Sequence, residues 1–324
     1  MLKAFTHRPG EGWSELGDLR RISEAIAEPG ELLWAYADIG SLTSEDAAQI
    51  AEEFGLHSLA VEDALNARQR PKVESYDNHL FVVVHQLDEV AGQLEARQIA
   101  CFVGKDYVLT IHDGADRLVE RAVARTRRTE REPGRGPSWI MHALVDAVVD
   151  EYQAIADAIE AEVEELEEGT LANPVGGSGQ QVYTIKQRIA RMRRYVMPGS
   201  RALAGFVEAA RAGGGASETT AAYFRDVLDH TLRIGDQIRN VEDLVNAMME
   251  FRRAEQANAL NEVTKKLTGW AAIIAIPTLI ASVYGMNFAL FPREGSTTGF
   301  FVAVSAMGAA AAALYVFFKR RRWL

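Results

Sequence analysis

Two long stretches without charge near the C-terminus constrain this chain more than any other feature. Residues 267–292 and 295–318 contain no Asp, Glu, Lys or Arg. About 20 apolar residues span the hydrocarbon core of a bilayer, and both stretches exceed that length. The pattern predicts two membrane-spanning helices, joined by a short loop that carries only Arg293 and Glu294 as charged residues.

The charges beside these stretches predict their orientation. Lys265 and Lys266 precede the first stretch, and residues 319–322 add four positive charges after the second. Lysine and arginine are retained preferentially on the cytoplasmic side of a membrane. We therefore expect a multi-pass protein of the inner (plasma) membrane with both chain ends in the cytoplasm. The N-terminal region has no apolar core of the length that a signal peptide needs.

The charge balance divides the chain in the same way. The 58 residues from Leu267 onward carry one glutamate against one lysine and four arginines, a balance of +4, whereas the whole chain carries −10. The upstream part therefore carries −14, which argues against a nucleic-acid partner and for attraction of cations. Cys101 is the only cysteine, so neither an internal disulfide nor a multi-cysteine zinc site is expected. It is interpreted as a small apolar residue within a strand.

The first 132 residues alternate between strand-like and helix-like segments. Residues 32–39, 79–87, 97–103 and 107–112 are rich in β-branched and aromatic residues and predict strands, the last two joined by a turn at 104–106. Thr43 or Ser44 can cap a helix that ends near Phe54, and Ser58 can cap another that ends near Asn66. We expect an α/β domain with a partly antiparallel sheet. Prolines and glycines at 133–137 mark its end.

The remainder predicts an almost entirely helical architecture. Long helices over about 139–168 and 181–212 form an antiparallel region at 133–216, and a third helix begins near 217 and continues into the membrane up to about 290. Such a helix is about 100 Å long, which is the length of a stalk. Its apolar residues pack against the same chain or against a partner chain. An outer loop at 291–298 and a second membrane helix with a basic tail at 299–324 complete the chain. The apolar stalk positions are Val227, Ile234, Ile238, Val241, Leu244 and Met248.

A stripe of mostly small or polar residues follows one face of the first membrane helix. Small residues at this spacing either line a lumen or allow helices to pack closely. We favour a pore, because the stripe continues beyond the uncharged stretch. One hairpin encloses no lumen, so a channel requires a ring of several copies. The stripe consists of Asn261, Thr264, Leu267, Ala271, Ala275, Thr278 and Ser282.

The end of this helix carries the motif Tyr284-Gly285-Met286-Asn287-Phe288, which resembles the signature of the CorA family of divalent-cation channels. Four further blocks support the resemblance, in the correct order along the chain: 61–66 with 69–74, 223–230, 261–268 and the basic tail at 319–324. The resemblance implies an α+β fold: an N-terminal cytoplasmic α/β domain, a long helical stalk and two C-terminal transmembrane helices. It further implies that five copies assemble as a homopentameric funnel.

The resemblance also implies a selectivity filter formed by Gly285, Met286 and Asn287. Mg²⁺ loses its hydration shell reluctantly. A ring of Asn287 carbonyl oxygens can accept hydrogen bonds from the waters around the ion without removing them, so selection would rest on the size of the hydrated ion. The expected substrate is Mg²⁺, with Co²⁺ or Ni²⁺ as further ions.

Regulation by internal Mg²⁺ is the second implication. In the family, carboxylates at subunit contacts bind this ion and hold the funnel closed. Asp226 occupies the matching position, and Asp88 or Glu89, directly after the strand at 81–87, is its expected partner. Without the family motif, Asp226 is interpreted as an ordinary solvated helix residue.

Two alternatives remain open at this point. Arg293 stands in the outer loop where many CorA proteins have glutamate, which lessens cation attraction and is compatible with the proton-coupled Zn²⁺ transporters of the related ZntB branch. The other alternative is a membrane-anchored cation sensor or scaffold that does not conduct. An enzyme is excluded, because the sequence shows no nucleophile paired with a base, no phosphate-binding loop and no metal-ligand cluster.

Overall fold

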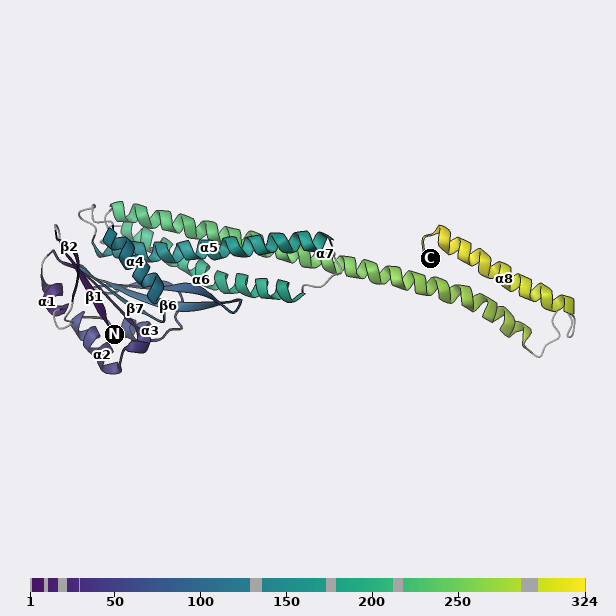
Figure 1. Ribbon diagram of the computed structural model, residues 1–324, viewed down its shortest axis with the longest axis horizontal. Coiled ribbons are helices and arrows are strands. Elements are labelled where there is room, and N and C mark those ends of the chain that lie inside the picture. Colours follow the sequence, from purple (N-terminus) through teal and green to yellow (C-terminus); the bar gives the residue numbers. More distant parts are fainter. Residues whose placement is uncertain are drawn as a thin grey trace. The chain divides into compact units, whose positions relative to one another are not determined.

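The computed structural model describes residues 2–8, 11–16, 22–28, 30–128, 136–172, 179–211, 218–286 and 297–323 (Figure 1). These residues belong to two compact units. The first unit extends to Asn246, without residues 168–177, and contains an α/β sheet domain and long helices. The second unit contains residues 168–177 and the chain from Ala247 onward.

Among the described residues of the first unit, seven strands form one mixed sheet with the order β2-β1-β3-β7-β6-β5-β4. Neighbouring strands are antiparallel except β3 and β7, which run parallel. The four predicted strands are confirmed as β3, β5, β6 and β7, whereas the sequence interpretation missed the other three. The bounds are β1 (Lys3–Arg8), β2 (Gly12–Glu15), β3 (Leu32–Asp38), β4 (Lys72–Ser75), β5 (Leu80–Val90), β6 (Gln93–Val103) and β7 (Tyr107–His112).

The hairpin between β5 and β6 is longer than predicted. Ala91 and Gly92 both have positive φ, 51° and 77°, as the two-residue turn of type I′ requires. This turn lets the ladder continue without interruption from Leu80 to Val90. The prediction that Asp88 and Glu89 follow the strand is therefore wrong, because both lie within β5. The predicted turn before β7 is confirmed, and a Cβ at Gly104 would lie 2.2 Å from the Tyr107 ring.

Three short helices, α1 (Ile22–Ala27), α2 (Ser44–Glu53) and α3 (Ser58–Leu65), cover one face of the sheet (Figure 1). Thr43 caps α2 in a capping box with Asp46, as one of the two alternatives predicted. His57 rather than Ser58 caps α3, since its ring nitrogen accepts the Leu59 N–H. The core below these helices is apolar and includes Ile50, Phe54, Ala60, Ala64, Phe81, Phe102 and Leu109.

Longer helices cover the other face. They are α4 (Asp116–Arg128), α5 (Pro137–Ala172), α6 (Gly179–Arg211) and the first part of α7 (Glu218–Tyr284). In Figure 1, α5, α6 and this part of α7 run side by side. Tyr152 of α5 donates to the His85 carbonyl of β5, and Arg193 of α6 pairs with Glu242 of α7 at 2.9 Å. The predicted long helices are confirmed, whereas α1 and α4 were missed. Cys101 is buried within β6, as expected.

The apolar positions of the stalk are already covered within one chain. Five of the six predicted positions, Val227, Ile234, Ile238, Val241 and Met248, are at most 5% exposed. Helices of the same chain therefore supply the principal packing of this part of α7.

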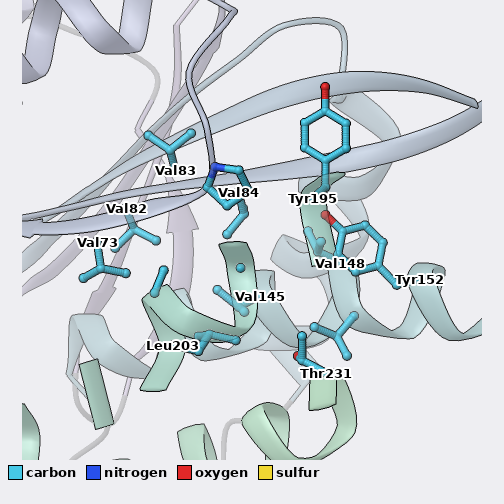
Figure 2. Close-up of a pocket in the computed structure, with 14 residues that line it drawn as sticks. Val73, Val82, Val83, Val84, Val145, Val148, Tyr152, Tyr195, Leu203 and Thr231 are labelled. Atoms are coloured by element: carbon cyan, nitrogen blue, oxygen red, sulfur yellow. The ribbon is translucent and has the colours of Figure 1, made fainter. Parts of the chain in front are cut away.

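A small apolar gap remains between β5 and the helices (Figure 2). Its volume is about 30 Å³, and half of its lining residues are valines, with Tyr152, Tyr195 and Thr231 as the residues that carry a hydroxyl group. The Tyr152 and Thr231 hydroxyls donate to backbone carbonyls. A gap of this size and lining is a packing defect of the core rather than a ligand site.

In the second unit, α7 continues to Tyr284 and α8 covers Thr297–Arg320. The Trp270 and Tyr315 rings, with centroids 6.4 Å apart, place α8 beside α7. Among the described residues, these two helices are long and apolar enough to cross a membrane. Large apolar side chains are exposed along both, among them Ile274, Leu279 and Phe300 at 64–66%. Lipid or further copies must cover such surfaces.

Candidate ion pathway and regulatory carboxylates

The residues predicted to line the pore are all exposed in the single chain. This holds for Asn261, Thr264, Leu267, Ala271, Ala275, Thr278 and Ser282. Exposure alone does not distinguish a lumen from a lipid-facing surface, because bulky Ile274 and Leu279 are equally exposed.

The position of α8 distinguishes the faces of α7. In the membrane segment of α7, the buried and half-buried residues recur every three or four positions and so form one row along the helix. The half-buried residues of α8 form a similar row, which indicates that the two rows face each other. At 3.6 residues per turn, the covered row lies roughly 150° around α7 from the small and polar stripe. The stripe therefore faces away from α8 and does not serve packing within the chain. The covered row consists of Gly269, Ala272, Ile273, Ile276, Pro277 and Ile280.

Two threonines give the stripe a specific chemistry. Thr264 Oγ1 donates to the Leu260 carbonyl at 2.9 Å, and Thr278 Oγ1 donates to the Ile274 carbonyl at 2.8 Å. Each hydroxyl hydrogen is thus directed along the helix, and the oxygen lone pairs remain available. Such oxygens can accept hydrogen bonds from the waters of a hydrated cation.

The end of α7 holds part of the predicted filter. The Gly285 N–H reaches the Ala281 carbonyl at 2.9 Å and the Ser282 carbonyl at 3.1 Å, so the last turn is closed by the backbone. Met286 follows, half exposed. A Cβ at Gly285 would lie 3.4 Å from the Ala281 oxygen, an ordinary contact, so a single chain does not require glycine here. Asn287 lies outside the described residues.

Asp88 of β5 is tied to the neighbouring strand. Arg97 of β6 donates from Nε to Asp88 Oδ2 at 2.7 Å, and Gln86 donates to Asp88 Oδ1 at 2.9 Å. About a third of the Asp88 side chain remains exposed, at 34%. Each carboxylate oxygen keeps a lone pair beyond the one that these donors use. A cation can therefore approach Asp88, but it competes with a guanidinium.

Glu89, the next residue of β5, has different partners from Asp88. Arg188 of α6 pairs with Glu89 at 3.2 Å and also pairs with Glu162 of α5. The Arg188 side chain is only 8% exposed. Glu89 thus neutralises a buried arginine, which gives it a structural role within one chain.

Glu151 of α5 joins Asp88 in a way that sequence reasoning missed. Burial raises the pKa of the Glu151 carboxyl, and the negative charge of Asp88 raises it further, while Arg121 opposes the shift. Arg121 lies 3.1 Å from Glu151. The only signal in the sequence is that the positions three and four residues before and after Glu151 are apolar, so that it interrupts an apolar helix face.

Asp226 is exposed on α7. Its side chain is 70% exposed, and His230 lies one turn further along, with Nε2 3.9 Å from Asp226 Oδ1. The structure thus places Asp226 on α7 and the other two predicted carboxylates, Asp88 and Glu89, on β5.

Comparison with known proteins identifies the family. Residues 32–320 match the family described as CorA-like Mg²⁺ transporter protein. The chain belongs to the CorA-like Mg²⁺ transporter family. It is 31% identical over 301 residues to the cobalt/magnesium transport protein CorA of Thermotoga maritima, which covers 89% of this chain and 83% of that protein.

Solved structures extend the likeness to almost the whole chain. The complete CorA magnesium transporter of Methanocaldococcus jannaschii has a TM-score of 0.80 at 17% identity and covers 99% of this chain and 98% of that one. The cytoplasmic domain of ZntB from Vibrio parahaemolyticus has a TM-score of 0.63 at 11% identity, with 79% and 98% covered. At these identities the likeness concerns the fold alone.

These comparisons confirm the predicted CorA family and fold class: an N-terminal α/β domain with a mixed sheet, a long stalk helix and two C-terminal apolar helices. They also confirm that the chain belongs to a transporter family and is not an enzyme. As in CorA, the protein is a membrane protein with two C-terminal spans.

Proposed function

We propose that this chain is the subunit of a Mg²⁺ channel that also passes Co²⁺ or Ni²⁺ and conducts down the membrane potential. The observation that carries the proposal is the stripe on α7, which is mostly small or polar, is exposed and faces away from α8. A ring of copies with α7 inside and α8 outside turns seven such residues per subunit toward one lumen. Family membership and the ion names of the T. maritima relative supply the substrate class.

Five copies form the ring, as the CorA resemblance implies. The ring lies in the inner membrane, and both ends of each chain are in the cytoplasm. Lys319 and Arg320 in the last turn of α8 support this orientation. Residues 1–132, 133–216 and the upstream part of 217–290 then form the cytoplasmic funnel, and 291–298 forms the outer loop between the spans.

The filter lies at the outer mouth, where Gly285, Met286 and Asn287 follow the last turn of α7. Asn287 accepts hydrogen bonds from the hydration shell of the ion, and the Thr278 hydroxyl oxygen continues the same water contacts inside the pore. Because the described stripe contains no carboxylate, selection rests on hydrated size and hydrogen-bond geometry rather than on net charge.

Internal Mg²⁺ closes the channel by binding between Asp226 of one subunit and Asp88 of the next. Asp88 suits this role better than Glu89, because Glu89 compensates the buried Arg188. Loss of the ion leaves carboxylates facing each other across the subunit contact, and their repulsion favours opening.

Ion flux into liposomes that contain the purified protein tests the proposal. Mg²⁺ and Zn²⁺ uptake is compared with and without an imposed pH gradient and an inside-negative potential. We expect Mg²⁺ entry that follows the voltage and is independent of the pH gradient. Zn²⁺ entry that grows with the proton gradient would indicate a transporter of the ZntB kind, and absence of any flux would indicate a sensor or scaffold.

Asn287→Ala tests the filter in the same liposomes. We expect loss of discrimination among divalent ions with the assembly intact by size-exclusion chromatography. Asn258→Ala, on the exposed part of α7 before the stripe, is the matched control and retains wild-type selectivity. Unchanged ion discrimination in Asn287→Ala would remove this residue from the filter.

A further inference from the structure

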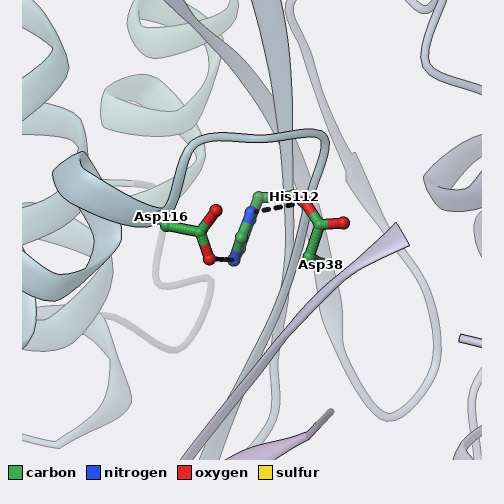
Figure 3. Close-up of side chains that lie close together, drawn as sticks. All are labelled: Asp38, His112 and Asp116. Carbon is green, nitrogen blue, oxygen red and sulfur yellow. Dashed lines mark ion pairs between the residues drawn. The ribbon is translucent and has the colours of Figure 1, made fainter. Parts of the chain in front are cut away.

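A second group of possible metal ligands lies at the carboxyl ends of the two parallel strands. Asp38 and His112 are register partners at the last positions of β3 and β7. Asp116 begins α4 four residues after His112. Adjacent parallel strands bring residues distant in sequence to one edge of the sheet, where α/β proteins commonly bind ligands. Figure 3 shows the His112 ring between the two carboxylates.

His112 is the unusual member of this group. Its side chain is 1% exposed. Nδ1 accepts the Ala115 N–H at 3.2 Å, so the ring proton is on Nε2. Nε2 is buried and has no hydrogen-bond partner, although it points to Asp116 Oδ1 at 3.8 Å. That distance is too long for a hydrogen bond, and a buried nitrogen without a partner is unfavourable.

Asp38 is held in place from two sides. Its Oδ1 accepts the Gly40 N–H at 2.8 Å, and its Oδ2 accepts the Gly114 N–H at 2.7 Å. The same Oδ2 lies 3.4 Å from His112 Nδ1. A carboxylate next to the second ring nitrogen is the usual support of a metal-binding histidine, because it accepts the N–H that remains after the other nitrogen binds the metal.

The geometry on the Nε2 side suits a small transition-metal ion. One potential ligand atom from each of the three residues lies within 4.8 Å of the others. Zn²⁺ binds histidine nitrogen and carboxylate oxygen at about 2.0–2.2 Å, so two ligands of one ion lie about 3–4 Å apart. The 3.8 Å between Nε2 and Asp116 Oδ1 falls in this range. Asp116 is 62% exposed, so an ion can reach the site from solvent.

We propose that His112 Nε2 and the Asp116 carboxylate bind one Zn²⁺, Co²⁺ or Ni²⁺ ion, with Asp38 as the residue that positions the ring. Water completes the coordination. Binding moves the ring proton from Nε2 to Nδ1, where Asp38 Oδ2 accepts it, and Nδ1 releases the Ala115 N–H. Imidazole nitrogen favours these ions over Mg²⁺, which prefers oxygen ligands. The site is thus distinct from the Mg²⁺ sites of the proposed channel and does not depend on that proposal.

Visible absorption of Co²⁺ added to the detergent-solubilised full-length protein tests the site, with Mg²⁺ in large excess to occupy oxygen-only sites. We expect wild type to show the intense bands of nitrogen-bound Co²⁺ with fewer than six ligands, and Zn²⁺ to abolish them. Asp116→Asn is expected to weaken binding at least tenfold. Asp116→His, which adds a second nitrogen, is expected to strengthen it.

Asp113→Asn is the matched control, because Asp113 is also an acidic residue beside His112 but offers no ligand atom to this group. It is expected to bind Co²⁺ as wild type does. Equal Co²⁺ titrations for wild type, Asp116→Asn and Asp116→His would overturn the proposal. Asp116 is exposed, so these variants fold irrespective of the outcome, and no transport measurement enters the result.

Discussion

Arg97 donates from Nε to Asp88 Oδ2 at 2.7 Å across the β5–β6 hairpin, so the proposed regulatory carboxylate already has a positive partner in its own chain. A divalent ion that binds Asp88 must share this oxygen with the guanidinium or displace it. The strength of the ion pair therefore sets how much internal Mg²⁺ is needed for closure.

Arg97→Gln is predicted to make the channel close at several-fold lower internal Mg²⁺. Removing the guanidinium leaves Asp88 without its positive partner on β6, which strengthens the attraction of this carboxylate for the ion. The half-inhibiting Mg²⁺ concentration is measured by flux from liposomes. Arg117→Gln on the exposed side of α4 is the control. A higher half-inhibiting concentration in Arg97→Gln would contradict the competition.

Asp226→Ala is predicted to raise the half-inhibiting concentration of internal Mg²⁺ about tenfold or more, because one of the two carboxylates at the subunit contact is lost. Asp226→Lys should raise this concentration further, since it removes the carboxylate and places a positive charge that repels the ion at the binding position. Asp229→Ala, exposed one turn further along α7, is the matched control. Wild-type inhibition in Asp226→Ala would exclude this residue from regulation.

Periodicity explains why much of this fold was predictable. The strands β3 and β7 and the helices from α5 onward are long or strongly patterned, and each is specified by its own residues. The edge strands β2 and β4 have four residues each, too few to show an alternating pattern, and β1 is polar or charged at more than half of its positions, so no local pattern marked them. The end of β5 was misplaced because Asp88 and Glu89 look like a strand terminus, whereas the turn at Ala91 and Gly92 determines the end.

The candidate sites, too, were predictable from the sequence only where all their residues lie on one element. The stripe on α7 lies on one helix, and its spacing was visible in the sequence. The pairings of Asp88 with Arg97 and of Glu89 with Arg188, and the approach of Glu151, depend on which elements pack together. His112 looked isolated in the sequence because Asp38 is 74 positions away, and only the parallel pairing of β3 with β7 brings them together.

His85 is predicted to make the cytoplasmic unit sensitive to mild acid. Burial lowers the pKa of its imidazole from 6.5 to about 4. Above pH 6.5 the residue is neutral in both states and has no effect, but below that pH the unfolded chain binds a proton that the folded chain resists. Stability is therefore lost as the pH falls from 6.5 toward 4, by about 2 kcal/mol at pH 5.

Thermal unfolding between pH 7.5 and 5 measures this effect. His85→Phe keeps a ring beside Tyr195, whose centroid lies 4.6 Å away, and is expected to show a smaller fall in midpoint over this range than wild type. The comparison concerns the slope with pH, so a uniform loss of stability in the variant does not obscure it. An unchanged slope in His85→Phe would contradict the prediction.

Cysteine substitution can decide whether the stripe on α7 faces a lumen, because the one native cysteine does not react with thiol reagents. Cys101 is 1% exposed, and burial raises the pKa of its thiol to about 12, so it stays protonated and unreactive. Ala275 lies on the stripe, whereas Ala272 lies on the half-covered face toward α8, less than one turn away. With internal Mg²⁺ removed, a charged thiol reagent is predicted to block Mg²⁺ flux through Ala275→Cys and to leave Ala272→Cys unaffected. If the stripe serves only for helix packing between copies, water does not reach Ala275→Cys, and neither variant is blocked.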